Sequence, residues 1–200
     1  MDLESALESL QEIRHQLTRS VTFTGYRPGF LAGVAGLAAI LAAGQLAWHA
    51  SMSVAAAYAQ WMVLASLIVL LTVALVFVPS LRSRYAVIRS LARGVALQFA
   101  PFAVVGAVGT IITYRLAPHL VPYLPAGWCA AFGLSIFAMQ PYLPRLVSLS
   151  GAWYLFVSTA LAIWPPRQVT ALALGMGLAF AVGHLVTAAI MRFALSDTER

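Results

Sequence analysis

The chain contains apolar runs that are too long for a water-soluble fold. Of its 200 residues, 62% are hydrophobic and only 9% are charged, whereas an average soluble domain has about 25% charged residues. A helix needs about 20 mostly apolar residues to cross the hydrocarbon core of a bilayer. Six stretches of the sequence approach or exceed this length. We therefore expect an all-α polytopic membrane protein with six transmembrane helices.

Prolines mark several ends of the expected helices. Pro79 and Ser80 should end the second helix, and Pro101 should bend the third about one turn from its start. The fourth stretch is the shortest, so the count of six depends most on it. The expected spans cover residues 28–50, 54–78, 94–116, 125–142, 145–164 and 169–193.

The placement of arginine predicts how the protein lies in the membrane. Cytoplasmic loops accumulate positive residues. With the N-terminus inside, the outer side holds only Arg115 and Arg167 of the 12 cationic residues, all of which are arginines. Tryptophan and tyrosine favour the two interfaces, and nine of them agree with an even number of crossings. At the outer ends of the spans are Trp48, Tyr58, Tyr114, Tyr123, Trp128 and Trp164, and at the inner ends are Tyr26, Tyr85 and Tyr142. We expect both termini to be cytoplasmic.

Apolar residues recur at heptad spacing through residues 2–20, which predicts an N-terminal amphipathic helix on the cytoplasmic side. Its first half is acidic and would be repelled by anionic lipid. We therefore expect it to pack against protein, either its own bundle, a second copy or a cytoplasmic partner. The expected organisation is residues 1–24 for this helix and a hinge, 25–194 for the six-helix bundle and 195–200 for a short cytoplasmic tail.

The segment from Ser80 to Arg93 also has an amphipathic pattern. Ser80 is placed to cap a short helix, and Arg82, Arg89 and Arg93 lie away from its apolar face. Such a helix would lie at the membrane surface, where each arginine near anionic headgroups contributes about 1 kcal/mol. An ordinary loop that sets the topology explains the same residues equally well.

The carboxylates are all in the tails, so residues 13–196 contain neither Asp nor Glu. Proton relays, cation sites and carboxylate-based catalysis inside membranes usually depend on buried acids. We therefore expect no enzyme activity, and no catalytic, cofactor or metal site. The arginines are spread over several loops instead of forming one face, so we expect no nucleic-acid partner.

His184 lies well inside the sixth span, where an ionisable group is a functional hypothesis by default. The alternative is a structural histidine, which is cheap to bury when a neighbouring helix provides a hydrogen bond. Together with Gln98 on the third span, His184 would mark a pocket for a small apolar or amphipathic molecule. This second hypothesis for the function is a carrier or substrate-binding subunit.

Small residues recur every four positions in two of the spans, a pattern that lets membrane helices approach closely. The positions are Gly25, Gly29 and Gly33 at the first span, and Gly175, Ala179 and Gly183 in the sixth. Contact within one bundle is the commoner outcome, and contact between copies in a homo-oligomer is the alternative. The function that we expect first is a non-enzymatic membrane component that acts through helix association or through a cytoplasmic partner.

The run IRHQLTRSVTFTGYRPGFLAGVAG, from Ile13 to Gly36, resembles the lead-in of a loosely defined group of bacterial multipass membrane proteins of unknown function. It covers about an eighth of the chain. The shared positions are Ile13, Arg14, Arg19, Ser20, Phe23 and the glycines that follow. The resemblance implies a protein of the bacterial inner membrane, and it carries over no site.

Overall fold

The computed structural model describes Phe23 and residues 25–198, and this part of the chain is helical without a strand. Six helical stretches in it are long and apolar enough to cross a membrane, which confirms the all-α fold and the six predicted spans. The spans are formed by α2 (Pro28–Ala47), α3 (Val54–Thr72) with α4 (Val78–Leu81), α5 (Ala86–Leu116), α6 (Leu124–Met139), α7 (Ser148–Ile163), and α8 (Val169–Gly177) with α9 (Gly183–Thr198).

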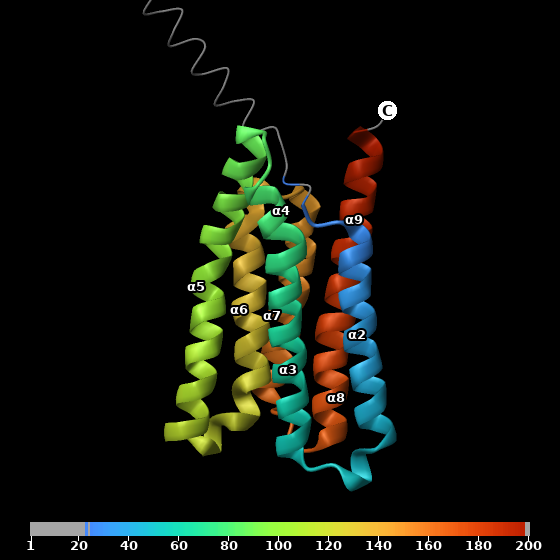
Figure 1. Cartoon of the computed structure of the whole chain (residues 1–200). Coiled ribbons are helices and arrows are strands. Elements are labelled where there is room, and N and C mark those ends of the chain that lie inside the picture. The colour runs from blue at the N-terminus through green and yellow to red at the C-terminus, as the bar shows by residue number, and fades with distance from the viewer. Residues whose placement is uncertain (1–22, 24, 199–200) are drawn as a thin grey trace, which may run out of the picture.

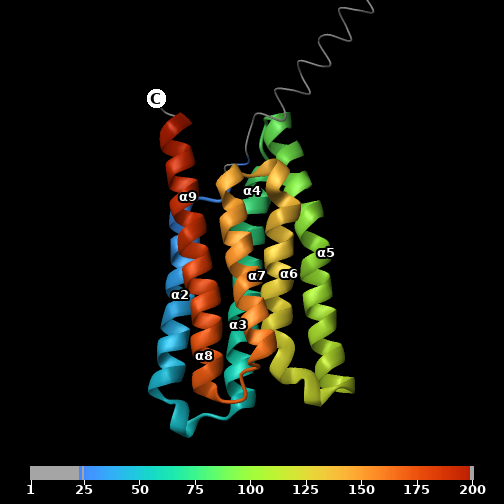
Figure 2. The ribbon, with the colours of Figure 1, turned by 180° about the vertical axis from the view of Figure 1, so that it is seen from behind.

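The spans run side by side, and α2 and α5 lie at opposite sides of the bundle in both views (Figures 1 and 2). Helix α6 packs between α5 and α7, while α2 packs against α8 and α9. The start of α2, the start of α5 and the end of α9 are at the same end of the bundle (Figure 1). We call this the basic end, because Arg82, Arg89 and Arg192 are there.

The second span does not stop at Pro79, in contrast to the expectation. The helix passes through this proline and ends at Leu81, after a π-helical segment at Val73–Phe77. A wider π turn is one way in which membrane helices accommodate a proline that cannot donate a backbone hydrogen bond. Ser80, which was expected to cap a new helix, instead donates from its hydroxyl to the Val76 carbonyl at 2.6 Å.

The segment at residues 80–93 is accordingly not a separate surface helix. After a turn at the basic end, α5 begins at Ala86 and continues unbroken through Pro101 to Leu116, over 31 residues. Arg89 and Arg93 are therefore on the first turns of a membrane span. The sequence pattern was misleading because the apolar face of these turns continues directly into the buried face of α5, where Leu91, Ala92 and Val95 lie.

The short fourth span is extended at both ends by 3-10 turns. These turns, Pro118–Tyr123 and Gln140–Tyr142, flank α6 and give a helical stretch of 25 residues. The sixth span is also continuous, because a second π-helical segment, Leu178–Val182, joins α8 to α9. The Trp153 indole N–H of α7 lies 3.2 Å from the Leu178 carbonyl oxygen and 3.3 Å from that of Ala179, so α7 provides a donor where the helix widens.

The core of the described chain is formed by two groups of buried side chains. The larger one involves every span and includes Phe23, which stacks on Phe77 with ring centroids 6.4 Å apart. The backbone N–H of Phe23 also donates to the Tyr142 carbonyl at 2.7 Å. Phe23 was assigned to the hinge, and it is in fact part of the bundle.

Candidate functional site

His184 is buried at the point where the sixth span returns from π-helical to α-helical geometry. It is the second residue of α9, directly after the π-helical segment, and is 7% exposed. Segments of π-helix inside α-helices occur frequently at functional sites. The position therefore combines an ionisable side chain inside a span with an irregular backbone, and both features are associated with functional sites.

The imidazole of His184 contacts two oxygen atoms through the same nitrogen. Its Nδ1 lies 2.8 Å from the Tyr154 hydroxyl and 2.9 Å from the Phe180 carbonyl oxygen. With a proton on Nδ1, the ring donates to the carbonyl; without that proton, Nδ1 accepts from the Tyr154 hydroxyl. Nδ1 therefore has a hydrogen-bond partner in either tautomer, and the Tyr154 hydroxyl joins α7 to α9.

Aromatic rings fill the space around this pair. The Phe132 ring of α6 is 5.5 Å from the His184 ring, and the Phe180 ring is 6.0 Å away in a stacked arrangement, measured between centroids. Phe132 also meets Tyr154 edge to face at 4.8 Å. Such rings contribute buried area and fix the orientation of the imidazole. The arrangement favours a structural hydrogen-bonded histidine in a packed environment.

Gln98 is not part of this site. It lies on the exposed face of α5, whereas the neighbouring Val95 and Phe99 face the protein. Neighbouring residues on a helix are rotated by about 100° about its axis, so Gln98 faces a different side from Phe99, which directly follows it. The pocket expected between His184 and Gln98 is therefore not formed by these two residues.

The small residues of the sixth span lie against α7 within the bundle. A Cβ added at Gly183 would lie 2.6 Å from the Tyr154 hydroxyl oxygen, and one at Gly175 would lie 2.6 Å from Leu161 Cδ2. Ala179 is fully buried between them along the sixth span. One turn further on, the Thr187 hydroxyl donates to Ser150 Oγ at 2.9 Å. These residues therefore serve close approach between helices of one chain.

The glycines at the first span behave differently, and the part of the chain that the structure describes does not form the helix contact that we favoured there. Gly25 precedes α2, and the nearest atoms to a Cβ at this position belong to the Phe23 ring. Gly29 and Gly33 are exposed, and no heavy atom of the described chain lies within 4 Å of a Cβ built at either. The buried face of α2 is formed instead by Leu31, Val34 and other residues out of phase with these glycines.

The arginines that were expected at the membrane surface are at the basic end. Arg82 and Arg93 are exposed, while Arg89 is half-buried and donates to the Ser83 carbonyl at 2.6 Å. No acidic residue between positions 13 and 196 is available to neutralise these charges. Arg89 closes the turn that joins the second and third spans, a role the sequence pattern did not suggest.

Polar groups elsewhere in the spans form hydrogen bonds between helices. Gln45 of α2 is 1% exposed, and its amide contacts the Ala57 carbonyl at 3.0 Å, Gln60 Oε1 at 2.9 Å and the Trp61 indole N–H at 3.0 Å. These three hydrogen bonds all go to α3, so a polar cluster joins the first two spans. Polar side chains in membrane spans commonly form such hydrogen bonds between helices.

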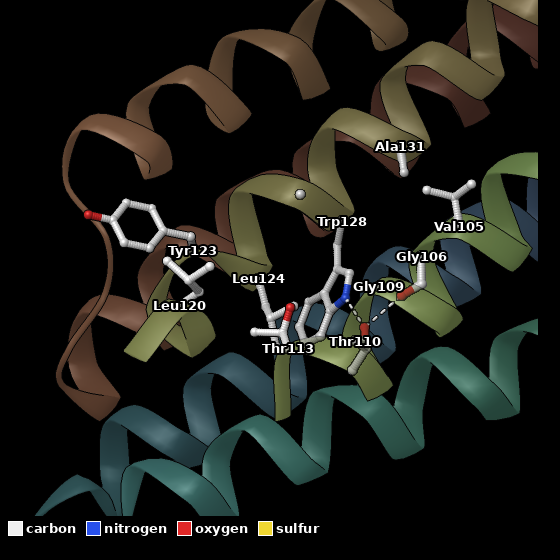
Figure 3. A pocket seen from close by; sticks show the side chains of 11 residues that line it. Val105, Gly106, Gly109, Thr110, Thr113, Leu120, Tyr123, Leu124, Trp128 and Ala131 are labelled. Carbon is white, nitrogen blue, oxygen red and sulfur yellow. Dashed lines mark hydrogen bonds between the residues drawn. The ribbon is translucent and has the colours of Figure 1, made fainter. Parts of the chain in front are cut away.

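A pocket lies between the second half of α5 and the first half of α6 (Figure 3), and His184 is not among its lining residues. Because α5 begins at the basic end (Figure 1), the pocket is in the opposite half of the bundle. Its volume is about 310 Å³. On its floor, the Trp128 indole N–H donates to Thr110 Oγ1 at 2.8 Å, and this hydroxyl donates to the Gly106 carbonyl at 2.7 Å (Figure 3). The lining residues are Val105, Gly106, Gly109, Thr110, Thr113, Leu120, Tyr123, Leu124, Gly127, Trp128 and Ala131.

Sequence reasoning missed Tyr154 and Trp128, the residues that organise the histidine site and the pocket. The sequence could have pointed to Tyr154, because tyrosine favours the interfaces of a membrane and a tyrosine in the middle of a span needs a hydrogen-bond partner inside the protein. Trp128 was assigned to the interface, and its partner Thr110 is 18 positions away in the sequence. Pairing across that distance depends on how α5 and α6 pack.

No known protein family, no curated protein and no solved structure matches this chain.

Proposed function

We propose that the protein is a non-enzymatic component of the bacterial inner membrane that acts by associating with further protein through its helices. The proposal is supported chiefly by the exposed glycines of α2. Gly29, Gly33 and Gly36 are spaced as i, i+4 and i+7, so they share one face of the helix. At none of the three would a Cβ have a neighbour within 4 Å in the described chain.

This face differs from an ordinary lipid-facing surface. Large apolar side chains cover the exposed surfaces of α3 and α5, for example Val63 at 68% and Leu97 at 73% exposure. Glycine in the same setting gives lipid little side-chain surface to contact, whereas it lets the backbone of a second helix approach closely. The same face continues along α2 through Ile40, which is 70% exposed, to the exposed Ala43 and Ala47, so its glycines are confined to the first half of the helix.

The absence of acids from residues 13–196 supports a role without catalytic chemistry. The N-terminal segment at residues 2–20, whose heptad pattern predicts an amphipathic helix, is outside the described residues. In the proposal it presents a cytoplasmic surface to a partner or to a second copy, with both chain termini in the cytoplasm and the basic end facing inward.

The test is the association state of the full chain in liposomes, measured by single-molecule photobleaching. Gly33→Leu should shift the population toward single copies, because a leucine prevents close approach at the centre of the glycine face. Ala65→Leu, at an exposed position of α3, is the matched control and should leave association unchanged. Deletion of residues 1–20 measures how much of the association depends on the N-terminal segment and how much on the glycine face.

The proposal fails if the parent chain is a single copy at every protein-to-lipid ratio. It also fails if both leucine variants and the deletion associate as the parent does. The carrier hypothesis has no comparable support, since Gln98 is exposed and aromatic rings occupy the space around His184.

A further inference from the structure

We infer that the pocket between α5 and α6 is a binding groove for one acyl chain of a bilayer phospholipid. This inference is independent of the proposed association through α2, because α2 and α5 lie at opposite sides of the bundle (Figures 1 and 2). It rests on how the groove is made, where it opens and which chemical groups it presents.

Three glycines make the groove, and they do not serve helix contact. No heavy atom of the described chain lies within 4 Å of a Cβ built at Gly106, Gly109 or Gly127. By contrast, Gly133, further along α6, sits so close to α7 that a Cβ there would be 3.0 Å from the Gly151 carbonyl oxygen. The first three glycines therefore leave a hollow where side chains would otherwise fill the space between α5 and α6.

The shape of the hollow suits a linear chain. The lining residues of α5 run from Val105 to Thr113, which is about 12 Å at 1.5 Å per residue. The opposite wall of the groove is formed by lining residues of α6 between Leu124 and Ala131. The volume of about 310 Å³ is at the lower limit of pockets that hold a small ligand. An elongated trough of this size fits a single hydrocarbon chain better than a compact molecule.

The groove opens sideways toward lipid. Val105 and Leu120, which both line it, are 66% and 44% exposed. Apolar side chains at such exposure within a membrane span face hydrocarbon. An unfilled hollow in this setting would forfeit the dispersion contacts of its lining atoms, so a hydrocarbon chain from the bilayer is the occupant that the surroundings supply.

The polar groups of the groove are arranged for an amphiphile. On the floor, the Trp128 N–H and the Thr110 hydroxyl are bonded to protein, so the aromatic surface there has no free donor. The Thr113 hydroxyl, nearer the end of α5, is a further polar group in the lining. Tyr123 lies at the end of the groove near the end of the span, and its hydroxyl points away from Trp128 (Figure 3). A chain on Trp128 would thus have its headgroup near Tyr123, where tyrosine favours the interface.

The experiment uses the full chain in nanodiscs that contain a phosphatidylglycerol with a diazirine on one acyl chain. After irradiation, the labelled positions are mapped by peptide mass spectrometry. The parent should be labelled more strongly on residues 105–113 and 124–131 than on residues 62–70 of α3, a lipid-exposed surface without a pocket. Free diazirine fatty acid in the same nanodiscs forms a second arm.

Gly109→Leu should abolish the additional labelling, because the new side chain fills the groove. Ala107→Leu places the same side chain on the exposed opposite face of α5 and should retain the labelling. Gly127→Leu fills the groove from the α6 wall, so the test does not depend on one variant folding. Four outcomes would each overturn the inference. The groove and α3 could be labelled equally, or both glycine variants could retain the excess labelling. The free fatty acid alone could label the groove, or the cross-links could join the groove to a second copy.

Discussion

Gly183 occupies a position where a side chain would collide with the group that holds His184. The Tyr154 hydroxyl would lie 2.6 Å from a Cβ at this position, and the same hydroxyl lies 2.8 Å from His184 Nδ1. The glycine thus does two things at once: it allows α7 and α9 to approach, and it makes room for the hydrogen bond between them. A recurring small residue in the sequence is explained here by one particular neighbour.

Gly183→Ala should therefore destabilise the protein by about 1–3 kcal/mol, the usual cost of adding a methyl group to a packed core. Gly36→Ala, at an exposed glycine with open space around it, should stay within about 0.5 kcal/mol of the parent. The free energy of unfolding in mixed micelles of increasing SDS content measures both. Equal stability of the two variants would contradict the packing described for Tyr154.

At the scale of elements, both interrupted spans contain a π-helical segment and continue through it. Val73–Phe77 precedes Pro79 in the second span, and Leu178–Val182 precedes His184 in the sixth. In the sixth span the indole of Trp153 lies within hydrogen-bond distance of two carbonyl oxygens of the widened turn. The Trp153 indole of α7 thus stabilises the π-helical segment of the sixth span, and we expect this segment to lose stability without that donor.

Trp153→Phe keeps the aromatic ring and removes the donor, so it should cost about 1 kcal/mol of stability. Amide hydrogen exchange should increase over residues 178–186, because the widened turn loses its external partner. Trp164→Phe is the control, since Trp164 is 73% exposed near the end of α7. Unchanged exchange in the Trp153 variant would show that the turn holds its geometry without α7.

At the scale of the whole molecule, the charged residues distinguish the two ends of the bundle. Arg82, Arg84, Arg89, Arg93, Arg145 and Arg192 are at the basic end or close to it, whereas Arg115 and Arg167 are at the other. Since positive residues are retained on the cytoplasmic side, this distribution predicts one orientation.

The orientation can be measured with single cysteines in a Cys129→Ala background, using a maleimide that does not cross membranes. Ser51→Cys, at the end opposite the basic end, should react in intact cells. Ser90→Cys, near the basic end, should react only after permeabilisation; both positions are exposed. Reaction of the Ser90 variant in intact cells would reverse the predicted topology.

The sequence by itself determined the fold class, the number of spans and most of their ends, because hydrocarbon accepts only long apolar helices and water accepts the loops between them. The first and fifth spans show this well, since Pro28 begins α2 and Pro165 follows the end of α7 closely. Pro79 was expected to end the second span, but the helix continues to Leu81 after a local π turn.

Only the tertiary structure decided which polar and small residues meet. His184 and Gln98 have similar sequence signals, yet one is buried against Tyr154 and the other is exposed. Gly33 and Gly183 both belong to four-residue repeats, yet within the described residues a Cβ at Gly183 would meet Tyr154 of another helix and one at Gly33 would meet open space. The reason is physical: in a membrane both faces of a helix are apolar, so the sequence pattern does not distinguish the face toward protein from the face toward lipid.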